Sequence, residues 1–292
     1  MGVRTNGTWV SEPPITLEEA ARRLGVHYMT AYRYVRTGRL PATKAGGIWR
    51  VDPGDVRRLG RPRTTPSGRA SRRRDYPRRL ARRLVVGDEP GAWTVLQDAL
   101  AAGMPAEELY LDLIAPALTA IGDDWAAGTV SIAQEHQASA VVLRLIGRLG
   151  PLFRRRGRTR GTVVLGAPPG DHHGIPSALV ADLLRARGFS VIDLGSDTPA
   201  ASFTDAAEHA ERLVAVGIAA TRTGNDGGIR SAVAAVRDQG LAPIVLGGAA
   251  VPTPARARQL GADHHSASAS EALELFDQLA QQRNRPGRGQ PA

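Results

Sequence analysis

The spacing of hydrophobic residues changes twice along the 292-residue chain, which indicates three folded regions. In the first region, apolar residues recur with the helical period after Thr16-Leu17-Glu18-Glu19, which has the form of a capping box. A second amphipathic helix is predicted from His27 to Arg36, and two alternating segments then flank Gly46-Gly47, as in a β-hairpin. Asp52-Pro53 caps a further short helix. These elements predict a winged helix-turn-helix within residues 1–59.

The second region, residues 76–158, keeps the helical period throughout and predicts a four-helix bundle. Its helices are expected from Pro77 to Val86, from Asp88, from Pro105 to Trp125, and from Ser131 to about Leu149. The last helix begins with Ser131-Ile132-Ala133-Gln134, another capping box. Its apolar stripe extends backward by helical spacing onto Glu135. A carboxylate on a core stripe needs a partner, so Glu135 is a candidate functional residue.

The third region, residues 159–282, alternates short apolar runs with helical segments. Four strands are expected at Thr162–Leu165, Ser190–Leu194, Ala215–Ala219 and Ile244–Leu246. Helices are expected at Ser177–Arg187, Ala200–Arg212, Ile229–Gln239 and Glu271–Gln281. This alternation predicts a flavodoxin-like, doubly wound parallel sheet, which binds ligands at the carboxyl ends of its strands. Five candidate ligand-binding residues fall at or just past such ends: His173, Asp197, Thr198, Thr221 and Gly247. The fold class is multidomain, α and α/β.

Composition adds the connections and the cellular setting. Residues 60–75 are rich in Arg, Pro, Ser and Thr without apolar periodicity, which predicts a flexible basic linker, and residues 283–292 predict a disordered tail. The chain has no cysteine, which excludes disulfides and thiolate metal sites. Neither a signal peptide nor an apolar run of about 18 residues is visible, so we expect a cytoplasmic protein without a membrane partner.

The formal net charge of +10 favours a polyanionic partner. Three side chains of the second predicted helix are expected to point outward, as in a recognition helix, and two basic side chains belong to the hairpin. The candidate DNA-binding residues are Tyr28, Thr30, Arg33, Lys44 and Arg50. With Leu24-Gly25-Val26 and Gly38-Arg39-Leu40-Pro41, the segment resembles the excisionase and MerR-type DNA-binding family. The alternative is a small helical interaction module.

Asp171-His172-His173 follows the first predicted strand of the sheet. With Gly195-x-Asp197-Thr198-Pro199 and Gly247-Gly248, it resembles the cobalamin-binding domain of methionine synthase, methylmutases and corrinoid proteins. The resemblance implies that His173 is the lower axial ligand of cobalt and that the nucleotide tail runs down a slot at the sheet edge. Asp171 can then accept the proton of the other ring nitrogen and fix the tautomer. Gly247-Gly248 would admit the tail, and Asp197 and Thr198 would lie near the corrin amides.

Two positions differ from that family pattern. Pro176 stands where the family loop ends in Gly, and Ala219 stands where a Ser holds the benzimidazole. Thr221 or Thr223 is a candidate replacement for the hydrogen bond of that Ser. His172 is the rival cobalt ligand, although the family register selects His173. His264-His265 is expected to be a surface pair.

Trp125, standing before Glu135-His136, extends the resemblance to the CarH-type cobalamin photoreceptor repressors. There the adenosyl group of adenosylcobalamin sits under the Trp and Glu of the cap, and the protein assembles into tetramers on its operator. Light breaks the cobalt–carbon bond, the cap histidine takes the vacant face, and the oligomer dissociates. The resemblance implies these roles for Trp125, Glu135 and His136. Local pattern alone favours a different account, in which Glu135 is a helix-terminal carboxylate, His136 a surface residue and Trp125 a core residue.

The resulting hypothesis is a cobalamin-dependent transcriptional repressor and photoreceptor that catalyses no turnover. Its expected cofactor is adenosylcobalamin, and its expected partners are double-stranded DNA and further copies of itself in a ligand-dependent tetramer. One alternative is a corrinoid methyl carrier that serves a methyltransferase. Another is a regulator that has kept the fold and lost the cofactor.

Overall fold

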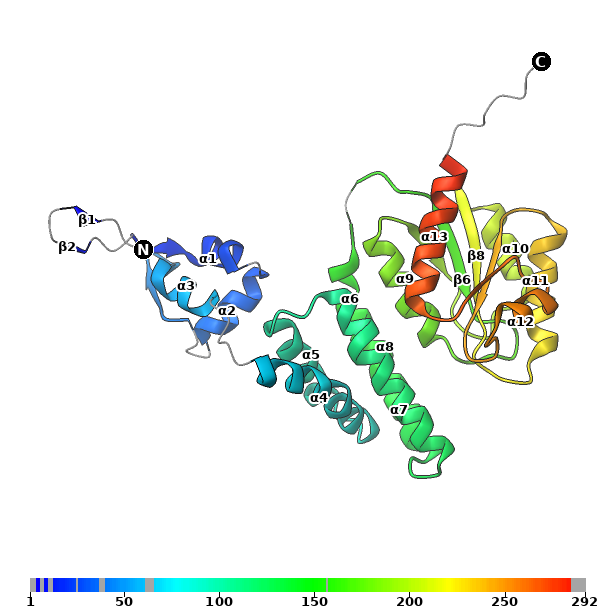
Figure 1. The fold of residues 1–292 in the computed structure, drawn as a ribbon, viewed down its shortest axis with the longest axis horizontal. Coiled ribbons are helices and arrows are strands. Elements are labelled where there is room, and N and C mark those ends of the chain that lie inside the picture. Colours follow the sequence, from blue (N-terminus) through cyan, green and yellow to red (C-terminus); the bar gives the residue numbers. More distant parts are fainter. Residues whose placement is uncertain are drawn as a thin grey trace, which may run out of the picture. The chain divides into compact units, whose positions relative to one another are not determined.

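The computed structural model describes residues 4–5, 8–9, 13–24, 26–36, 40–60, 66–155 and 157–284 (Figure 1). At residues 4–5, 8–9, 58, 60, 66–74 and 284 it describes the backbone alone. Gly25 and Gly38-Arg39 of the expected signatures, part of the expected linker, and the expected tail from residue 285 lie outside these ranges. The chain forms two compact units, residues 1–76 with 94–105 and residues 77–93 with 106–292.

The first unit has a small three-stranded antiparallel sheet and short helices. Strand order is β3-β5-β4. The elements are β1 Arg4–Thr5, β2 Thr8–Trp9, β3 Ile15–Thr16, α1 Leu17–Leu24, α2 Tyr28–Arg36, β4 Ala42–Ala45, β5 Ile48–Val51 and α3 Pro53–Gly60. Gly46 and Gly47, both with positive φ, turn the chain between β4 and β5. The core of this unit lies between α1, α2 and the sheet: Leu17, Ala20, Ala21, Ala31, Tyr34, Leu40, Val51 and Val56.

The middle of the chain is helical, as predicted. Its elements are α4 Pro66–Val85, α5 Glu89–Ala101, α6 Ala106–Glu108, the π-helix η1 Leu109–Ile114, α7 Ala115–Ala126, α8 Ile132–Leu149 and the 3-10 turn η2 Gly150–Phe153. Within the second unit, α7, α8 and the adjoining parts of α4 and α5 form a helical bundle. The Arg144 guanidinium donates to Glu89, and Arg148 lies 3.9 Å from the centre of the Trp93 ring. The predicted capping box is present, because Ser131 and Gln134 each accept from the other's backbone N–H.

Helix α4 corrects the predicted linker. Residues 66–75 belong to this helix, whereas we expected residues 60–75 to be flexible. We expected a linker because this segment has no apolar periodicity. An apolar period indicates that one face of a helix is buried, and its absence does not exclude a helix. Arg is a good helix former, and Pro66 occupies the first helical position, where proline is tolerated. The lack of an apolar period therefore did not exclude a helix at these residues.

A π-helix joins the bundle to the sheet through one buried side chain. Tyr110, in η1, is fully buried, and its hydroxyl donates to Asp182 Oδ2 at 2.8 Å. Asp182 also accepts from Arg185 at 2.8 Å, one turn further along the same helix. Burial, followed by the charge and hydrogen bond of Asp182, raises the pKa of Tyr110. The hydroxyl therefore stays protonated and remains the donor.

The third region is a five-stranded parallel sheet in the order β10-β9-β8-β6-β7. Its strands are β6 Thr162–Gly166, β7 Ser190–Asp193, β8 Leu213–Ala219, β9 Ile244–Gly247 and β10 His264–Ser266. Its helices are α9 Ile175–Ala186, α10 Ala200–Glu208, α11 Asp226–Asp238, α12 Pro254–Gln259 and α13 Ala269–Asn284. The helical bundle and the parallel sheet confirm the coarse fold prediction.

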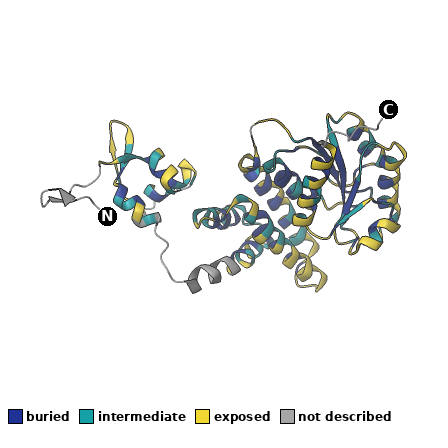
Figure 2. Cartoon of the chain, turned by 45° about the horizontal axis from the view of Figure 1, so that its top comes forward, coloured by how far each residue is buried: buried dark blue, intermediate teal, exposed yellow. Residues whose placement is uncertain are grey.

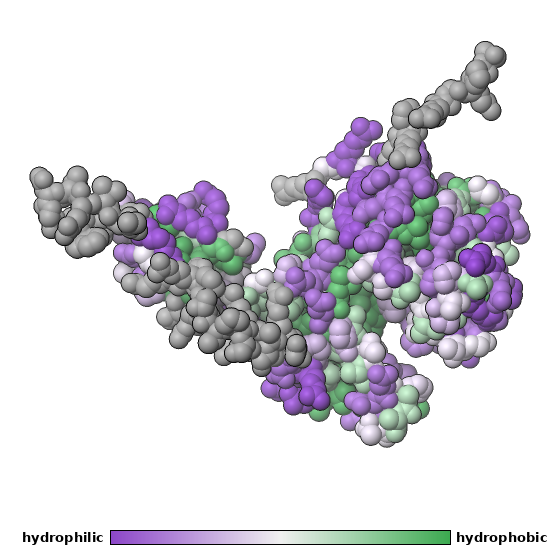
Figure 3. Space-filling view, in the orientation of Figure 1, coloured by the Kyte–Doolittle hydropathy of each residue, from purple (hydrophilic) through white to green (hydrophobic). Residues whose placement is uncertain are grey.

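Helices cover both faces of this sheet (Figure 1), with α9 and α13 on one face and α10 and α11 on the other. The strands are largely buried, whereas exposed residues follow the outer sides of the helices and the turn between α7 and α8 (Figure 2). The outward side of α13 is hydrophilic (Figure 3). Buried strands with polar helix exteriors are what a doubly wound sheet requires.

Two sequence predictions for this region need correction, and one helix was missed. His264-His265 is not a simple surface pair, because both residues form the edge strand β10 and His265 is bonded through Nε2 to the carbonyl of Val251. Helix α12 was not predicted. Helix α10 ends at Glu208 rather than Arg212. Short polar elements such as β10 and α12 lack an apolar period, so the pattern cannot reveal them. No helix among the described residues is long and apolar enough to cross a membrane.

Candidate cofactor site

The loop between β6 and α9, residues 167–174, lies at the carboxyl edge of the sheet. Because β6 pairs with both β7 and β8, the loops that follow these two strands flank it. This is the position at which open α/β sheets bind ligands. Asp171, His172 and His173 all belong to this loop.

Asp171 is fully buried, and its carboxylate accepts hydrogen bonds from four donors. Oδ1 accepts from the His173 backbone N–H at 3.1 Å and lies 2.7 Å from His173 Nδ1. Oδ2 accepts from the backbone N–H groups of Thr221 at 2.6 Å and Arg222 at 2.9 Å. Burial alone raises the pKa of Asp171, but the bonds from His173, Arg222 and Thr221 outweigh it and lower the pKa to about 2. The carboxylate is therefore ionised and can only accept.

His173 is oriented by this carboxylate. An ionised acceptor opposite Nδ1 requires the proton on Nδ1, which leaves Nε2 with a lone pair for a metal. The hydrogen bond to Asp171 raises the pKa of His173, against a smaller opposing effect of burial, and the charges of Asp171 and Glu135 raise it further. The His173 side chain is 54% exposed, so the imidazole ring is accessible from solvent.

His172, the rival ligand, has no comparable support. Its side chain is 75% exposed, and its Nδ1 lies 3.8 Å from Asp197 Oδ2, beyond hydrogen-bond distance. The geometry therefore favours His173 over His172 as the oriented imidazole.

Asp197 and Thr198 form hydrogen bonds that hold the loop in place. The Asp197 backbone N–H donates to the Asp171 carbonyl at 2.7 Å, and its Oδ1 accepts from the Gly170 N–H at 2.7 Å. Asp197 does so from the left-handed region, with φ of 50°. Thr198 is buried, and its hydroxyl is directed at the carbonyls of Leu194 and Gly195. The Thr198 hydroxyl therefore has partners inside the protein. That Thr198 lies near the corrin amides stays a prediction.

Gly247 and Gly248 are explained by contacts inside the protein. A Cβ on Gly247 would lie 2.6 Å from Ser266 Oγ on the neighbouring strand, and a Cβ on Gly248 would collide with the Ala220 carbonyl. Gly248 also has φ of 106°, which disfavours any larger residue. The pair thus allows β8, β9 and β10 to pack closely. That it also admits a nucleotide tail stays a prediction.

The departures from the family pattern lie in accessible positions. Pro176 is exposed and stands in the first turn of α9, where proline is tolerated. Thr223 is exposed, and Ala219 and Thr221 are partly buried. The replacement of the missing serine hydrogen bond by Thr221 or Thr223 stays a prediction.

The candidate cap residues lie at the exposed end of the bundle. Trp125 is 49% exposed, so the account that makes it a core residue is wrong. Glu135 accepts from the Ser139 hydroxyl at 2.8 Å and lies 2.9 Å from His136 Nδ1. It is not the cap of α8, since Ser131 and Gln134 provide that. Glu135 is near enough to His173 for its charge to contribute to the raised pKa of that residue.

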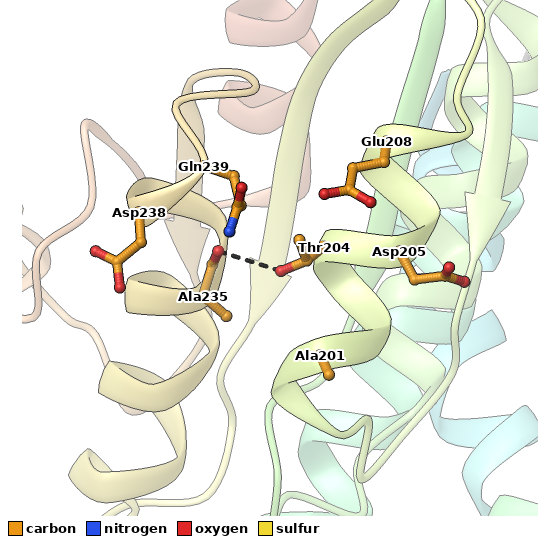
Figure 4. A pocket seen from close by; sticks show the side chains of 7 residues that line it. All are labelled: Ala201, Thr204, Asp205, Glu208, Ala235, Asp238 and Gln239. Carbon is orange, nitrogen blue, oxygen red and sulfur yellow. Dashed lines mark hydrogen bonds between the residues drawn. The ribbon is translucent and has the colours of Figure 1, made fainter.

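A shallow groove elsewhere on the sheet domain does not include any predicted site residue. It lies between α10 and α11, has a volume of about 380 Å³, and is lined partly by Asp205, Glu208 and Asp238 (Figure 4). Thr204 bridges the two helices by donating to the Ala235 carbonyl at 3.1 Å.

In the first unit, the five candidate DNA-binding residues differ in their surroundings. Tyr28 is 42% exposed and stacks on Tyr32. Lys44 lies over the Trp49 ring, 5.9 Å from its centre. Thr30 and Arg50 are partly buried. The prediction that Arg33 points outward is incomplete, because its guanidinium donates to Asp98 Oδ1 on α5 at 3.1 Å.

Sequence reasoning missed two side chains of the site, Arg222 and Asn225. Arg222 Nη1 donates to the Gly170 carbonyl, and Asn225 Nδ2 donates to the Pro169 carbonyl, each at 2.8 Å. Both lie more than 50 positions from the loop they hold. Nothing in the sequence around an arginine or an asparagine in a loop indicates that its side chain will bond a distant backbone carbonyl.

The donor set fits a metal that brings most of its own ligands. Among the described residues, no group of three or more His, Asp or Glu side chains could hold a metal ion. A single oriented imidazole, with one nitrogen fixed by a buried carboxylate, suits a cobalt ion whose other ligands come from a macrocycle.

Comparison with known proteins agrees with this chemistry. Residues 77–149 and residues 161–276 each match a B12 binding domain. Trimethylamine corrinoid protein 1 of Methanosarcina acetivorans is 31% identical over 193 residues, which are 64% of this chain and 88% of that protein. The chain belongs to the corrinoid protein family. It is a cobalamin-binding protein in which the bundle and the sheet are the two B12 binding domains.

Two further comparisons describe the relatives and the N-terminal region. Trimethylamine corrinoid protein 1 of Methanosarcina mazei is 29% identical over 191 residues, 64% of this chain and 88% of that protein. The solved monomethylamine corrinoid protein of Methanosarcina barkeri shares the fold, with a TM-score of 0.59 at 23% identity, covering 67% of this chain and 94% of that one. Residues 15–59 of this corrinoid protein match a helix-turn-helix domain.

Asp171→Asn tests the buried carboxylate. The pKa of Asp171 is lower in the folded protein than its usual 3.8, so its stabilisation is present above pH 3.8 and is lost as the pH falls through about 2. We expect the variant to lower the free energy of unfolding at pH 7 by about 2 kcal/mol or more. Urea unfolding followed by circular dichroism between pH 2 and pH 7 measures this.

The control for that experiment is Asp205→Asn, which changes a carboxylate that is 78% exposed. It should leave the free energy of unfolding nearly unchanged. Equal effects of the two substitutions, or an Asp171→Asn effect that does not shrink toward pH 2, would contradict the role of Asp171.

Proposed function

We propose that this protein is a DNA-binding transcriptional regulator that uses adenosylcobalamin to respond to light. One observation carries the proposal: a helix-turn-helix domain and both B12 binding domains occur in the same chain. The aligned 193 residues make up 88% of the M. acetivorans relative, so its remaining eighth is too short for the 45 residues that match the helix-turn-helix here. A carrier of methyl groups has no use for such a domain.

His173 would hold the cobalt from below, with Asp171 fixing its tautomer. Adenosylcobalamin, when bound, supplies a cobalt–carbon bond that light can break. Trp125 and Glu135 would contact the adenosyl group, and His136 would offer a second imidazole to the cobalt after illumination. The half-exposed Trp125 and the 76% exposed side chain of His136 support these roles, because both are available to a ligand.

Substitution of the two loop histidines tests the cobalt ligand. His173→Ala should weaken cobalamin binding strongly or leave the benzimidazole as the lower ligand, because no oriented nitrogen remains. His172→Ala is the matched control and should do neither. Absorption spectra and binding titrations with adenosylcobalamin measure both effects. Equal loss from the two variants, or loss from His172→Ala alone, would rule out the assignment.

DNA binding by α2 would compete with an internal ion pair. Arg33 pairs with Asp98, and the hydroxyl of the neighbouring core residue Tyr34 donates to the Ala101 carbonyl at 2.6 Å, so α2 is bonded to the end of α5. The Arg33 side chain is still 36% exposed. A phosphate or a guanine edge would have to draw the guanidinium away from Asp98, which gives the bundle helix α5 an influence on DNA affinity.

Arg33→Ala should therefore reduce affinity for operator DNA by about 1–3 kcal/mol. Asp98→Ala should raise it, because the competing carboxylate is gone. Glu19→Ala is the control, since Glu19 also pairs with arginines of the same unit, Arg22 and Arg23. Gel retardation of promoter DNA at fixed salt measures all three. Unchanged affinity in Arg33→Ala would count against α2 as the recognition helix.

Light and ligand should change the assembly of the protein. A ligand drives assembly only through contacts that differ between states, and Trp125 with Glu135 would sense the adenosyl group. Adenosylcobalamin in the dark should raise the oligomeric state, with a tetramer expected, and DNA affinity. Methylcobalamin should not, and green light should reverse the effect. Size-exclusion chromatography with light scattering measures this.

Trp125→Ala should bind cobalamin but assemble poorly, whereas Leu143→Ala, at a residue of similar exposure, should assemble normally. His136→Ala should respond to light without forming a stable bis-histidine product. An oligomer indifferent to ligand and light would rule out the photoreceptor role and leave cobalamin binding intact.

A corrinoid methyl carrier is the second candidate, favoured by the names of the curated relatives. It would serve a methyltransferase and bind cobalamin through the same His173. Tight, ligand-independent DNA binding would be foreign to that role. Regulator and carrier are both proposed to act without catalysing a turnover of their own.

A further inference from the structure

We infer that Arg222 and Asn225 are positioning residues that fix the metal-facing direction of His173. The inference rests on the proposed role of His173 as the cobalt ligand. Arg222 and Asn225 belong to the loop between β8 and α11, and they donate to two consecutive carbonyls, Gly170 and Pro169, of the histidine loop. Neither residue is assigned a role by the Asp-x-His motif.

The side-chain bonds and the carboxylate bonds form one connection between the two loops. The same residue, Arg222, donates its backbone N–H to Asp171 and its guanidinium to Gly170. Two bonds from Arg222 to adjacent residues, Gly170 and Asp171, thus fix the distance between the β8–α11 loop and the histidine loop. Asn225 precedes α11 but does not cap it with its side chain, which is directed at Pro169 instead.

The remaining sides of the histidine loop leave it little freedom. Asp197 bonds the Gly170 N–H and the Asp171 carbonyl from the β7 side. Gly170 has φ of 78°, and a Cβ on Gly228, in the first turn of α11, would collide with the Pro169 carbonyl. The histidine loop is therefore restrained on both sides, by the loop after β7 and by the loop after β8.

These bonds affect the direction of the His173 imidazole rather than its basicity. Asp171 sets the tautomer of His173, but the orientation of the Asp171 carboxylate depends on where the Thr221 and Arg222 N–H groups lie. Arg222 and Asn225 hold those groups against the histidine loop. Without the side-chain bonds, Asp171 and His173 would still pair, but over a wider range of directions, and Nε2 would meet the cobalt less often.

Hydrogen exchange of the cofactor-free protein tests directly whether Arg222 and Asn225 restrain the histidine loop. The variants are Arg222→Gln and Asn225→Asp, the second of which places an acceptor opposite the Pro169 carbonyl. Backbone amides in peptides covering residues 166–174 should exchange faster in both variants. Arg230→Gln is the matched control, because Arg230 also donates to a backbone carbonyl, that of Gln259 at 2.7 Å, away from this loop. Exchange as slow as in the wild type would overturn the inference.

The spectroscopic test follows the metal ligand. Protein labelled with ¹⁵N-histidine and loaded with cob(II)alamin reports by electron paramagnetic resonance whether a protein imidazole or the benzimidazole is bound. In Arg222→Gln the imidazole-bound fraction should fall, and affinity should drop about tenfold, as for other residues that orient metal ligands. Arg222→Lys should restore both in part, because an ammonium can reach the same carbonyl. An unchanged imidazole-bound fraction in Arg222→Gln would refute the positioning role.

The two measurements separate this inference from the proposed function. If wild-type protein shows no histidine signal on cobalt, the role of His173 fails even when loop exchange responds to Arg222→Gln. If the wild type shows the histidine signal but the variants change neither exchange nor the signal, the positioning role fails and the cobalt ligand stands. Thermal unfolding of each variant identifies any that do not fold, and Arg222→Lys then provides the decisive comparison with Arg222→Gln.

Discussion

A buried carboxylate with four donors is the interaction on which the rest of the site depends. Asp171 has no exposed surface, and burial without partners would make its ionised form costly. Donors from its own loop and from the loop after β8 compensate for this cost. The same bonds that keep Asp171 charged hold the two loops together and give His173 a single tautomer. The bonds that stabilise the two loops are therefore the same ones that orient His173.

Strand order makes that contact possible. In the order β10-β9-β8-β6-β7, the strand that leads into Asp171 lies between β8 and β7, so its loop has a neighbour on each side. Residues far apart in sequence meet there because parallel strands all end at the same edge. The small residues at Gly247 and Gly248 serve this arrangement by letting the next strands close.

The sequence was sufficient for elements that carry an apolar period and for a ligand motif confined to one loop. It predicted β6, β7, β8 and β9, the capping box of α8, and the pairing of Asp171 with His173. It did not predict β10, whose edge position needs no apolar run, or the helical backbone of residues 66–75, where the sequence has no apolar period. Arg222 and Asn225 were invisible because their contacts depend on how two loops approach after the sheet has formed.

The π-helix η1 has a consequence for the geometry of the cap. A π-helix differs from an α-helix by one extra residue, and each residue of an α-helix turns the chain by about 100°. Tyr110, inside η1, is anchored to Asp182, while Trp125 lies near the end of the helix that continues from it. The extra residue therefore sets the angle around the helix axis between the Tyr110 and Trp125 side chains. Removing one residue from this turn would rotate the following helix by about 100° relative to Tyr110. Trp125 would then point in a different direction.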